Sequence, residues 1–390
     1  MAKKVKYTVF GQDLDPAAIE QMENAISLPV SVKGALLPDA HKGYGLPIGG
    51  VLATDNAVIP YAVGVDIACR VKMSVLPISF DQFDDLRGQL KQVLDKETRF
   101  GYGKDYKHPN THPVMDRDWS FCPTVANLKD KAWKQLGTSG AGNHFAEFGR
   151  LSIKQKALNL SPGDYIALIT HSGSRGTGAA IAKHYSTLAQ KCCRKLPKHL
   201  KHLAWLDMDK EEGIEYFKAM TLMGEYSAAN HDIIHKKIFN ALGENPVTTV
   251  ENHHNFAFKE KIGLRQVIVH RKGAVPASKG TLGIIPGTMT DPAYVVKGLG
   301  NEESINSSAH GAGRLMSRTA AFKRFSQKDL QNVLTKNKVT LISAGLDEIP
   351  MAYKNIDQVM SQQKGLVEIL AKFTPRLVKM ASAKPRKKIR

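Results

Sequence analysis

Residues 64–69 read Gly-Val-Asp-Ile-Ala-Cys and follow the apolar, β-rich run of residues 57–63. Asp66 and Cys69 stand three positions apart, so a tight turn after a strand at 57–63 aims a carboxylate and a thiolate at one point. A thiolate binds soft metal ions and can bridge two cations, while a carboxylate holds one of them. The alternative is a small buried cysteine beside a solvated aspartate, because such short spacings also arise by chance. The rest of the chain has to decide between these two interpretations.

Charge and composition narrow the class of protein. The 390 residues include 55 Lys and Arg against 36 Asp and Glu, a formal charge of +19, and 42% are hydrophobic. Length alone favours two or three domains with a sizeable core. The positive charge favours a polyanionic partner through phosphate neutralisation and counterion release. Four irregularly spaced cysteines, no signal-like N-terminus and no run of bilayer length lead us to expect a cytoplasmic protein that does not enter a membrane.

Two patterns in the first third predict local structure. Residues 7–10 are expected to form a strand, and Asp15 followed by Pro16 is typical of a helix N-terminus. Residues 99–124 are polar and interrupted by prolines, so we expect a surface loop there.

Two glycine-rich stretches carry polar side chains that suit a ligand site. Residues 38–50 contain Asp39, and residues 137–147 end with His144 and Glu147. Many glycines indicate a backbone that turns sharply or lies close to a ligand, with an ordinary turn as the alternative. His144 and Glu147 point to different faces of a regular strand unless that strand bends.

The clearest local unit is a strand at residues 164–170, a glycine-rich turn at 171–178 and a helix at 179–195. Free backbone N–H groups and the helix dipole make such a turn an anion site. The turn begins with His171 and contains Arg175, but it lacks the Gly-Lys-Ser/Thr ending of a Walker loop. It therefore predicts phosphate binding without identifying the ligand.

Histidines recur in the second half of the chain. His231 and His235 lie in a predicted amphipathic helix at 213–242, where charged neighbours indicate a solvated face more than a ligand pair. Residues 251–255 read Glu-Asn-His-His-Asn, which is typical of a ligand strand whose amide side chains hold the histidines in place. A structural or exposed role is the alternative for His254 and its neighbour.

Residues 307–314 present a histidine between small residues. Gly311 and Gly313 leave the ring of His310 sterically open, and Arg314 can neutralise a phosphate. This is how a nucleophilic or phosphate-orienting histidine is presented, with an exposed histidine at a helix N-terminus as the alternative.

The candidate ligands lie on separate segments, so a shared site requires most of the chain to fold as one unit. They are Asp66, Cys69, His144, His171 and His254. This argues against the two or three domains suggested by length. The last residues, 383–390, are strongly basic and are expected to form a mobile tail with nucleic-acid contact as a secondary role.

Taken in order, these motifs closely resemble those of the RtcB-type RNA ligases, also called 3′-phosphate RNA ligases or RNA-splicing ligases. The matching motifs are Pro38-Asp-Ala-His41, Val63-Gly-Val-Asp-Ile-Ala-Cys69, Gly142-Asn-His-Phe145, His171-Ser-Gly-Ser-Arg-Gly176, His253-His-Asn255, His310-Gly-Ala-Gly-Arg314 and Glu348-Ile-Pro-Met-Ala-Tyr-Lys354. The resemblance implies an α+β fold with a β-rich core flanked by helices. It places one mixed α/β ligase domain at residues 1–380 and a basic tail at 381–390.

The resemblance also implies a role for each site residue. Cys69 bridges two manganese ions, of which one is also held by Asp66 and His144 and the other by His171 and His254. His310 attacks the α-phosphate of GTP and forms a histidine–GMP intermediate. The remaining implied contacts are Asn143 to the nucleotide phosphate, Phe145, Glu147 and Tyr353 around guanosine, Gly311 and Gly313 beside the nucleotide, and Arg175 and Arg314 to phosphate or RNA.

The implied reaction joins an RNA 3′-phosphate or 2′,3′-cyclic phosphate to a 5′-hydroxyl in RNA repair or splicing. A nucleotidyltransferase that caps 3′-phosphate ends without joining them is the alternative. The sequence leaves the physiological RNA and any accessory activator unassigned.

Three positions depart from the family pattern. Arg70 replaces a glycine after Cys69, which we expect to place a cation next to the thiolate. Ala293 stands where a serine is expected, and Met380 where a lysine is expected to meet guanine, with Lys379 one residue away. The metal ligands and the nucleophile are thus retained, whereas the base pocket is altered.

Overall fold

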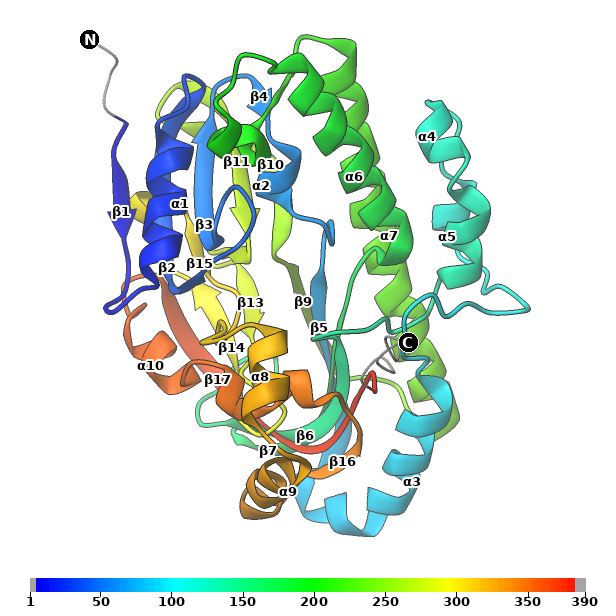
Figure 1. Ribbon diagram of the computed structural model, residues 1–390. Helices are drawn as coiled ribbons and strands as arrows, with labels where there is room; N and C mark the ends of the chain where they lie inside the picture. The colour runs from blue at the N-terminus through cyan, green and yellow to red at the C-terminus, as the bar shows by residue number, and fades with distance from the viewer. Residues whose placement is uncertain (1–4, 383–390) are drawn as a thin grey trace.

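Two β-sheets occupy the centre of the computed structural model, which describes residues 5–382 (Figure 1). Within this part of the chain the larger sheet has eight strands, in the order β13 (Leu282–Ile285), β14 (Ala293–Gly298), β17 (Val367–Met380), β6 (Phe145–Ile153), β7 (Gly163–Ser172), β5 (Arg70–Ser79) and β9 (Thr248–His253), with β16 (Thr340–Ser343) paired to β17. The smaller sheet has the order β1 (Tyr7–Val9), β2 (Ser31–His41), β3 (Ile48–Thr54), β11 (Arg265–Lys272) and β10 (Asn255–Ile262). Two short pairs join β12 (Ala274–Pro276) to β15 (Ser307–Ala309) and β4 (Ala57–Val58) to β8 (Leu206–Asp207).

The larger sheet curls, and both of its faces are apolar. Along β7, Ala167 and Ile169 pack with the cluster inside the curl, whereas Ile166 and Leu168 pack with the cluster outside it. The end strands meet, because Asn252 of β9 accepts a hydrogen bond from the backbone N–H of Ile284 in β13 at 2.8 Å. The curled sheet therefore encloses an apolar core of its own.

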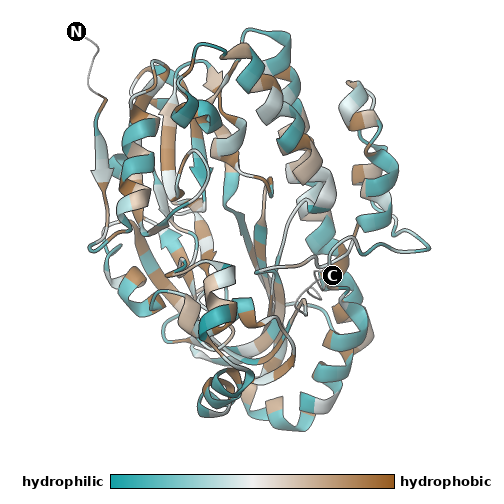
Figure 2. Ribbon diagram, in the orientation of Figure 1, coloured by the Kyte–Doolittle hydropathy of each residue, from teal (hydrophilic) through white to brown (hydrophobic). Residues whose placement is uncertain are grey.

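Helices cover the outer faces of both sheets (Figure 1). They are α1 (Pro16–Ile26), α2 (Pro60–Val63), α3 (Phe83–Glu97), α4 (Pro123–Ala126), α5 (Lys129–Gln135), α6 (Arg175–Cys192), α7 (Glu211–Leu242), α8 (Arg318–Arg324), α9 (Gln327–Lys336) and α10 (Ile356–Ser361). The short 3₁₀ helices of this part of the chain are η1 (Phe80–Gln82), η2 (Pro113–Asp116), η3 (Lys198–Leu203), η4 (Glu302–Ser304), η5 (Leu346–Glu348) and η6 (Pro350–Ala352). Figure 2 shows hydrophobic strands at the centre and mainly hydrophilic residues on the outer helices. The α+β class with a β-rich core flanked by helices is confirmed.

Several local predictions are confirmed. Asp15 caps α1 by accepting a hydrogen bond from Ala17, and Pro16 occupies the first helical position. The strand, turn and helix expected at 164–195 are β7 and α6. No helix among residues 5–382 combines the length and the apolar character that crossing a membrane requires. The predicted basic tail at 383–390 lies outside the described residues.

The strand predicted at residues 57–63 is wrong. Only Ala57 and Val58 pair as a strand, and Pro60 begins the short helix α2. Proline suits a first helical turn because its missing N–H needs no partner there. The turn that carries Asp66 and Cys69 therefore connects a helix to β5, not a strand to the next element.

One prediction about exposure holds in part and another is wrong. Most of residues 99–124 form an exposed loop as expected, but Trp119 and Cys122 are buried in the apolar cluster beneath α6 and α7. His231 and His235 are buried as well, and each forms a 2.8 Å hydrogen bond with the Thr170 hydroxyl. The reason is that this face of α7 packs on the sheet. Asp232 and Lys236, which follow the two histidines in the sequence, are exposed on other faces of the helix.

The strand register brings distant residues to one edge of the larger sheet. Arg70, the first residue of β5, pairs with Ser172 at the end of β7 and with His253 at the end of β9. Phe145, the first residue of β6, pairs with His171 and with Met380. The segments before β5 and β6 and those after β7 and β9 therefore meet at this edge.

Candidate metal and nucleotide site

Five of the predicted ligands converge at this edge of the sheet. The sulfur of Cys69 lies 3.3 Å from Nε2 of His144 and 3.0 Å from Nε2 of His171. Asp66 Oδ2 lies 3.0 Å from His144 Nε2, and His254 Nε2 lies 3.4 Å from His171 Nε2. Cys69 is thus central, with a carboxylate and an imidazole on one side and two imidazoles on the other.

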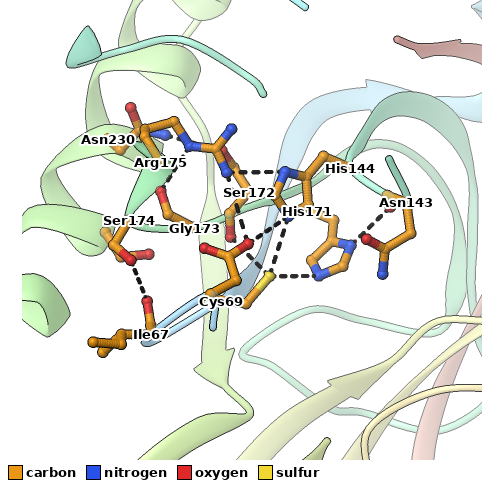
Figure 3. A network of polar contacts seen from close by, with 12 residues as sticks. Ile67, Cys69, Asn143, His144, His171, Ser172, Gly173, Ser174, Arg175 and Asn230 are labelled. Carbon is orange, nitrogen blue, oxygen red and sulfur yellow. Dashed lines mark hydrogen bonds and ion pairs between the residues drawn. The ribbon is translucent and has the colours of Figure 1, made fainter. Parts of the chain in front are cut away.

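Neighbouring groups fix the orientation of the histidine rings (Figure 3). The backbone carbonyl of Asn143 accepts from Nδ1 of His171 at 3.0 Å, which leaves the Nε2 lone pair facing Cys69. Arg175 donates to Nδ1 of His144 at 2.9 Å, so the proton of the neutral ring lies on Nε2, which faces Asp66 at 3.0 Å; a metal ion bound at Nε2 would have to displace that proton. His254 is buried, and its Nδ1 has no hydrogen-bond partner among the described residues.

The protonation of these groups suits a cation. Burial, and next His144, lowers the pKa of His171 to about 3, and burial followed by His310 holds the pKa of His254 well below its usual value. Burial pushes the pKa of Asp66 up, but contacts with His144 and Arg175 outweigh it and bring that pKa to about 2. Burial, and next Asp66, raise the pKa of the Cys69 thiol well above its usual value, so a metal ion would have to displace the thiol proton. Neutral imidazoles, an ionised carboxylate and a cysteine sulfur form a donor set that fits a divalent transition metal.

The backbone around the ligands is tightly constrained. Ala68 and Arg175 both have positive φ angles, 53° and 58°, which non-glycine residues rarely adopt outside functional sites. At Gly140 an added Cβ would lie 1.4 Å from the Arg175 guanidinium and 2.7 Å from the His144 ring. Only glycine at this position allows Arg175 to hold His144.

His310 is held by a carboxylate from the other sheet. It follows β15, and Asp39 at the end of β2 lies with Oδ2 2.6 Å from Nδ1 of His310 and 3.1 Å from its backbone N–H. Asp39 is fully buried, whereas the His310 side chain keeps 18% of its surface exposed. A proton on Nδ1 leaves the lone pair of Nε2 free, so His310 is presented as a nucleophile.

A cavity of about 1240 Å³ joins His310 to the metal-ligand cluster. Its wall includes Asp66, His144, His171, His254 and His310 together with Asn143, Gly311 and Gly313. The ring centroids of His254 and His310 are 4.9 Å apart. His310 and the ligand cluster therefore face one space that is large enough for a nucleotide.

One wall of the cavity is suited to a nucleobase. Phe145 and Glu147 stand two residues apart on β6 and so share a face, and Met380 pairs in register with Phe145. Burial raises the pKa of Glu147 well above its usual value, and no cation counters this. Lys379 points to the opposite face and donates to the Asp95 and Thr98 carbonyls at 2.6 and 3.3 Å.

Tyr353 belongs to a charged cluster beside this wall. Arg314 donates to the Tyr353 hydroxyl at 2.8 Å and lies 3.2 Å from Glu348, which also accepts from Tyr353. Arg318 adds a second ion pair with Glu348 at 3.2 Å. Glu348 is buried and matched by two guanidinium groups, so it holds Arg314 and Arg318 at the edge of the cavity.

Three expectations about nearby residues are revised. Arg70 does not place its charge against the thiolate, because it forms a 2.9 Å ion pair with Glu251, and Arg175 is the cation at the cluster. Ala293 packs opposite Phe373 in the apolar core of the curled sheet, away from the cavity wall. Arg175 itself is almost completely buried against His144 and Asp66, so it does not present a free guanidinium for RNA.

Sequence reasoning assigned no role to Asp39 or Glu348, although it quoted both within motifs. Asp39 lies 271 positions from His310, so no local pattern connects them. The usable signals were an Asp in a glycine-rich stretch and a Glu close to Tyr353, each of which needed a partner that only the fold supplies.

A family profile and the individual relatives that match this chain all belong to one family. A family profile described as "tRNA-splicing ligase RtcB" matches residues 21–125 and 119–380. The chain is 34% identical over 395 residues to the RNA-splicing ligase RtcB of Escherichia coli K12, covering 94% of each chain. It is 31% identical over 444 residues to the tRNA-splicing ligase RtcB of Methanococcus maripaludis, covering 93% of this chain and 91% of that protein. The RNA-splicing ligase RtcB of Mycobacterium tuberculosis is 30% identical over 433 residues, with 91% and 98% covered.

Proposed function

The chain belongs to the RtcB family, and from this membership and the geometry of the site we propose that it is a GTP- and manganese-dependent RNA ligase. It joins an RNA 3′-phosphate or 2′,3′-cyclic phosphate end to a 5′-hydroxyl end in RNA repair or splicing, in the cytoplasm. The observation that carries the proposal is His310, held by Asp39 in the cavity that also contains the metal-ligand cluster. The ligase domain spans residues 1–380, followed by the basic tail.

The five converging side chains are the residues that would hold two manganese ions. Asp66 and His144 would hold one and His171 and His254 the other, with Cys69 as their shared ligand; the distances between these groups support this assignment. When bound, the ions polarise phosphate oxygens and neutralise the charge that develops on them. The protein orients the ligands through Asn143 and Arg175.

The residues of the cavity account for a three-step reaction. Nε2 of His310 attacks the α-phosphorus of GTP, so that a P–N bond forms and pyrophosphate leaves. An oxygen of the RNA 3′-phosphate then attacks this phosphorus and breaks the P–N bond, which transfers GMP to the RNA. Finally the 5′-hydroxyl oxygen attacks the RNA 3′-phosphorus, GMP leaves, and the hydroxyl proton passes to solvent. A cyclic phosphate is first opened by water.

Guanosine occupies the wall formed by Phe145, Glu147 and Tyr353. Glu147 accepts from the N1 and N2 donors of guanine, whose hydrogen bonds favour its ionised form against the burial that raises its pKa, and the aromatic rings pack on the base. Asn143 binds the nucleotide phosphate, while Gly311 and Gly313 leave room for it beside His310. Arg314 and Arg318 contribute positive charge at the rim of the cavity for phosphates of nucleotide or RNA.

The decisive experiment incubates the full chain with GTP, Mn²⁺ and two RNA pieces, one ending in a 3′-phosphate or cyclic phosphate and the other starting with a 5′-hydroxyl. A joined product supports the ligase. A 3′-capped product that is never joined supports the alternative nucleotidyltransferase, and retention of RNA without any covalent product contradicts both.

Asp39→Asn is expected to slow formation of the protein–GMP adduct by about 10²- to 10⁴-fold. The reason is that an Asn amide can donate to Nδ1 of His310, which favours the tautomer with a proton on Nε2 and removes the attacking lone pair. Adduct formation is measured with labelled GTP in the absence of RNA. Metal content and the thermal unfolding midpoint serve as controls, and an unchanged rate with an intact fold contradicts the role of Asp39.

Met380→Lys is expected to sharpen selection of GTP over ATP by about tenfold or more, because a charged donor can bond guanine O6 but repels the adenine amino group. The wild type, with Met380 in the wall, should therefore discriminate less sharply than relatives that carry lysine. Ala293 is left out because it lies away from the cavity. Adduct yields with labelled GTP and ATP at equal concentration measure the effect, with Met380→Leu as the matched uncharged control. Equal selectivity in both variants contradicts it.

A further inference from the structure

One stretch of the chain carries many positive charges and no negative ones. No Asp or Glu lies between Asp164 and Asp207, and residues 183–202 form what we call the basic segment. Its exposed cationic side chains are Lys183, Lys191, Arg194, Lys195, Lys198 and Lys201. Within residues 5–382 none of the six has a carboxylate within 4.0 Å. Glu212, at the start of α7, is the carboxylate that acts on this segment, since burial and then Glu212 raise the pKa of the Cys192 thiol.

The basic segment is physically connected to the candidate active site at both ends. Helix α6 begins at Arg175, beside the metal ligands, and its 18 residues extend about 27 Å to the centre of the segment. The chain then folds back through η3, where His202 packs against the loop that forms one rim of the cavity. An added Cβ at Gly45 in that loop would lie 2.5 Å from the His202 carbonyl oxygen.

An exposed aromatic ring stands between the cavity and the basic segment. Tyr44 lines the cavity, yet 67% of its surface is exposed, and its ring lies edge-on to His202 at 5.8 Å. Its backbone is fixed because the carbonyl accepts a hydrogen bond from buried Lys272. An exposed ring beside a row of cations is the arrangement on which single-stranded nucleic acids stack their bases while the backbone contacts positive charge.

The spacing of the cations on η3 also suits a strand of phosphates. Lys198 and Lys201 are three residues apart, and a 3₁₀ turn has three residues per turn, so the two side chains leave the same side of η3, about 6 Å apart along its axis. Both are exposed, and neither side chain forms a hydrogen bond to another described residue. They are free to contact successive phosphates.

We propose that Tyr44 and the basic segment form the surface along which one single-stranded arm of the RNA substrate runs away from the active site. The inference rests on the proposed ligase function and adds a path for the RNA outside the cavity. One base stacks on Tyr44, and the phosphates beyond it lie on Lys198, Lys201 and the C-terminal end of α6.

The test compares two double variants of the full chain that remove the same charge. Lys198→Gln with Lys201→Gln alters the basic segment, and Lys328→Gln with Lys336→Gln alters exposed lysines of α9, at the far end of the molecule in Figure 1. The first is expected to bind a long single-stranded RNA about tenfold more weakly and to reduce the slope of log K against log salt by about 1.4, since each phosphate contact contributes about 0.7. A short RNA that ends at the cavity should bind all proteins equally, and GMP adduct formation without RNA should be unchanged.

The outcomes separate this inference from the proposed function. If the wild type joins RNA and the η3 variant matches the α9 variant in affinity and salt slope, the path is overturned and the ligase stands. If the wild type binds RNA without joining it and the η3 variant alone loses affinity, the path stands and the ligase falls. A wild type that neither binds nor joins RNA overturns both.

Discussion

Replacement of His310 by alanine is expected to eliminate the protein-linked GMP completely. Its Nε2 is the lone pair that the fold presents to the cavity, and Asp39 fixes the opposite ring nitrogen. His144, His171 and His254, which also line the cavity, would have to leave the metals to take over the attack. The adduct is measured by labelling with GTP, acid lability of the linkage and mapping of the labelled peptide.

The alanine variant leaves the carboxylate of Asp39 buried with only a backbone N–H as partner, which costs about 1–3 kcal/mol of stability. His310→Gln is therefore made in parallel, because its amide can still donate to Asp39. Both variants should retain the wild-type metal content, and His184→Ala, which removes an exposed histidine of α6, should label normally. A labelled adduct that persists in both His310 variants would assign the nucleophile to another residue.

Cys69→Ala is expected to lower adduct formation by at least about 10³-fold, equivalent to about 4 kcal/mol of transition-state stabilisation. The sulfur is the atom that the two halves of the ligand cluster share, at 3.3 and 3.0 Å from the nearest imidazole nitrogens. Under the proposed assignment, both cations would lose their shared ligand. The fold should persist, because the turn is also held by hydrogen bonds from Ala68 to Asn255 and from Ser227 to Ala68.

Metal content and thermal unfolding provide readouts that do not depend on activity. A ligand that binds the folded state at a hundred times its Kd adds about 2.7 kcal/mol of stability, so Mn²⁺ should raise the unfolding midpoint of the wild type but not of Cys69→Ala. Cys122→Ala is the matched control, because Cys122 is equally buried but packs beneath α6. Normal metal stoichiometry and activity in Cys69→Ala would refute the bridging assignment.

The sequence predicted those features that depend on neighbours in the chain. The start of α1 follows from Asp15 and Pro16, which act within one helical turn. The strand, turn and helix around His171 follow from an apolar run that ends in glycines. The candidate ligands could be proposed from residue type and from the family resemblance, and the structure brings all five together.

Features that depend on distant partners were missed for physical reasons. Whether Pro60 ends a strand or starts a helix depends on packing, and here α2 packs in the core with α6. His231 and His235 are buried because Thr170 and Ser74, from two strands, supply hydrogen bonds that no sequence window contains. Arg70 turns away from the sulfur because Glu251 lies across the sheet on β9.

The position of β17 has a consequence for how the protein is made. This strand comes last in the described chain but lies inside the larger sheet, between β14 and β6, and its final residue forms part of the nucleobase wall. During synthesis the two neighbouring strands emerge first and must wait with unpaired edges, which are prone to join other chains. The ligase cannot become active on the ribosome before its last segment has been translated, and a chain terminated early should be a substrate for chaperones or proteases, not a partly working enzyme.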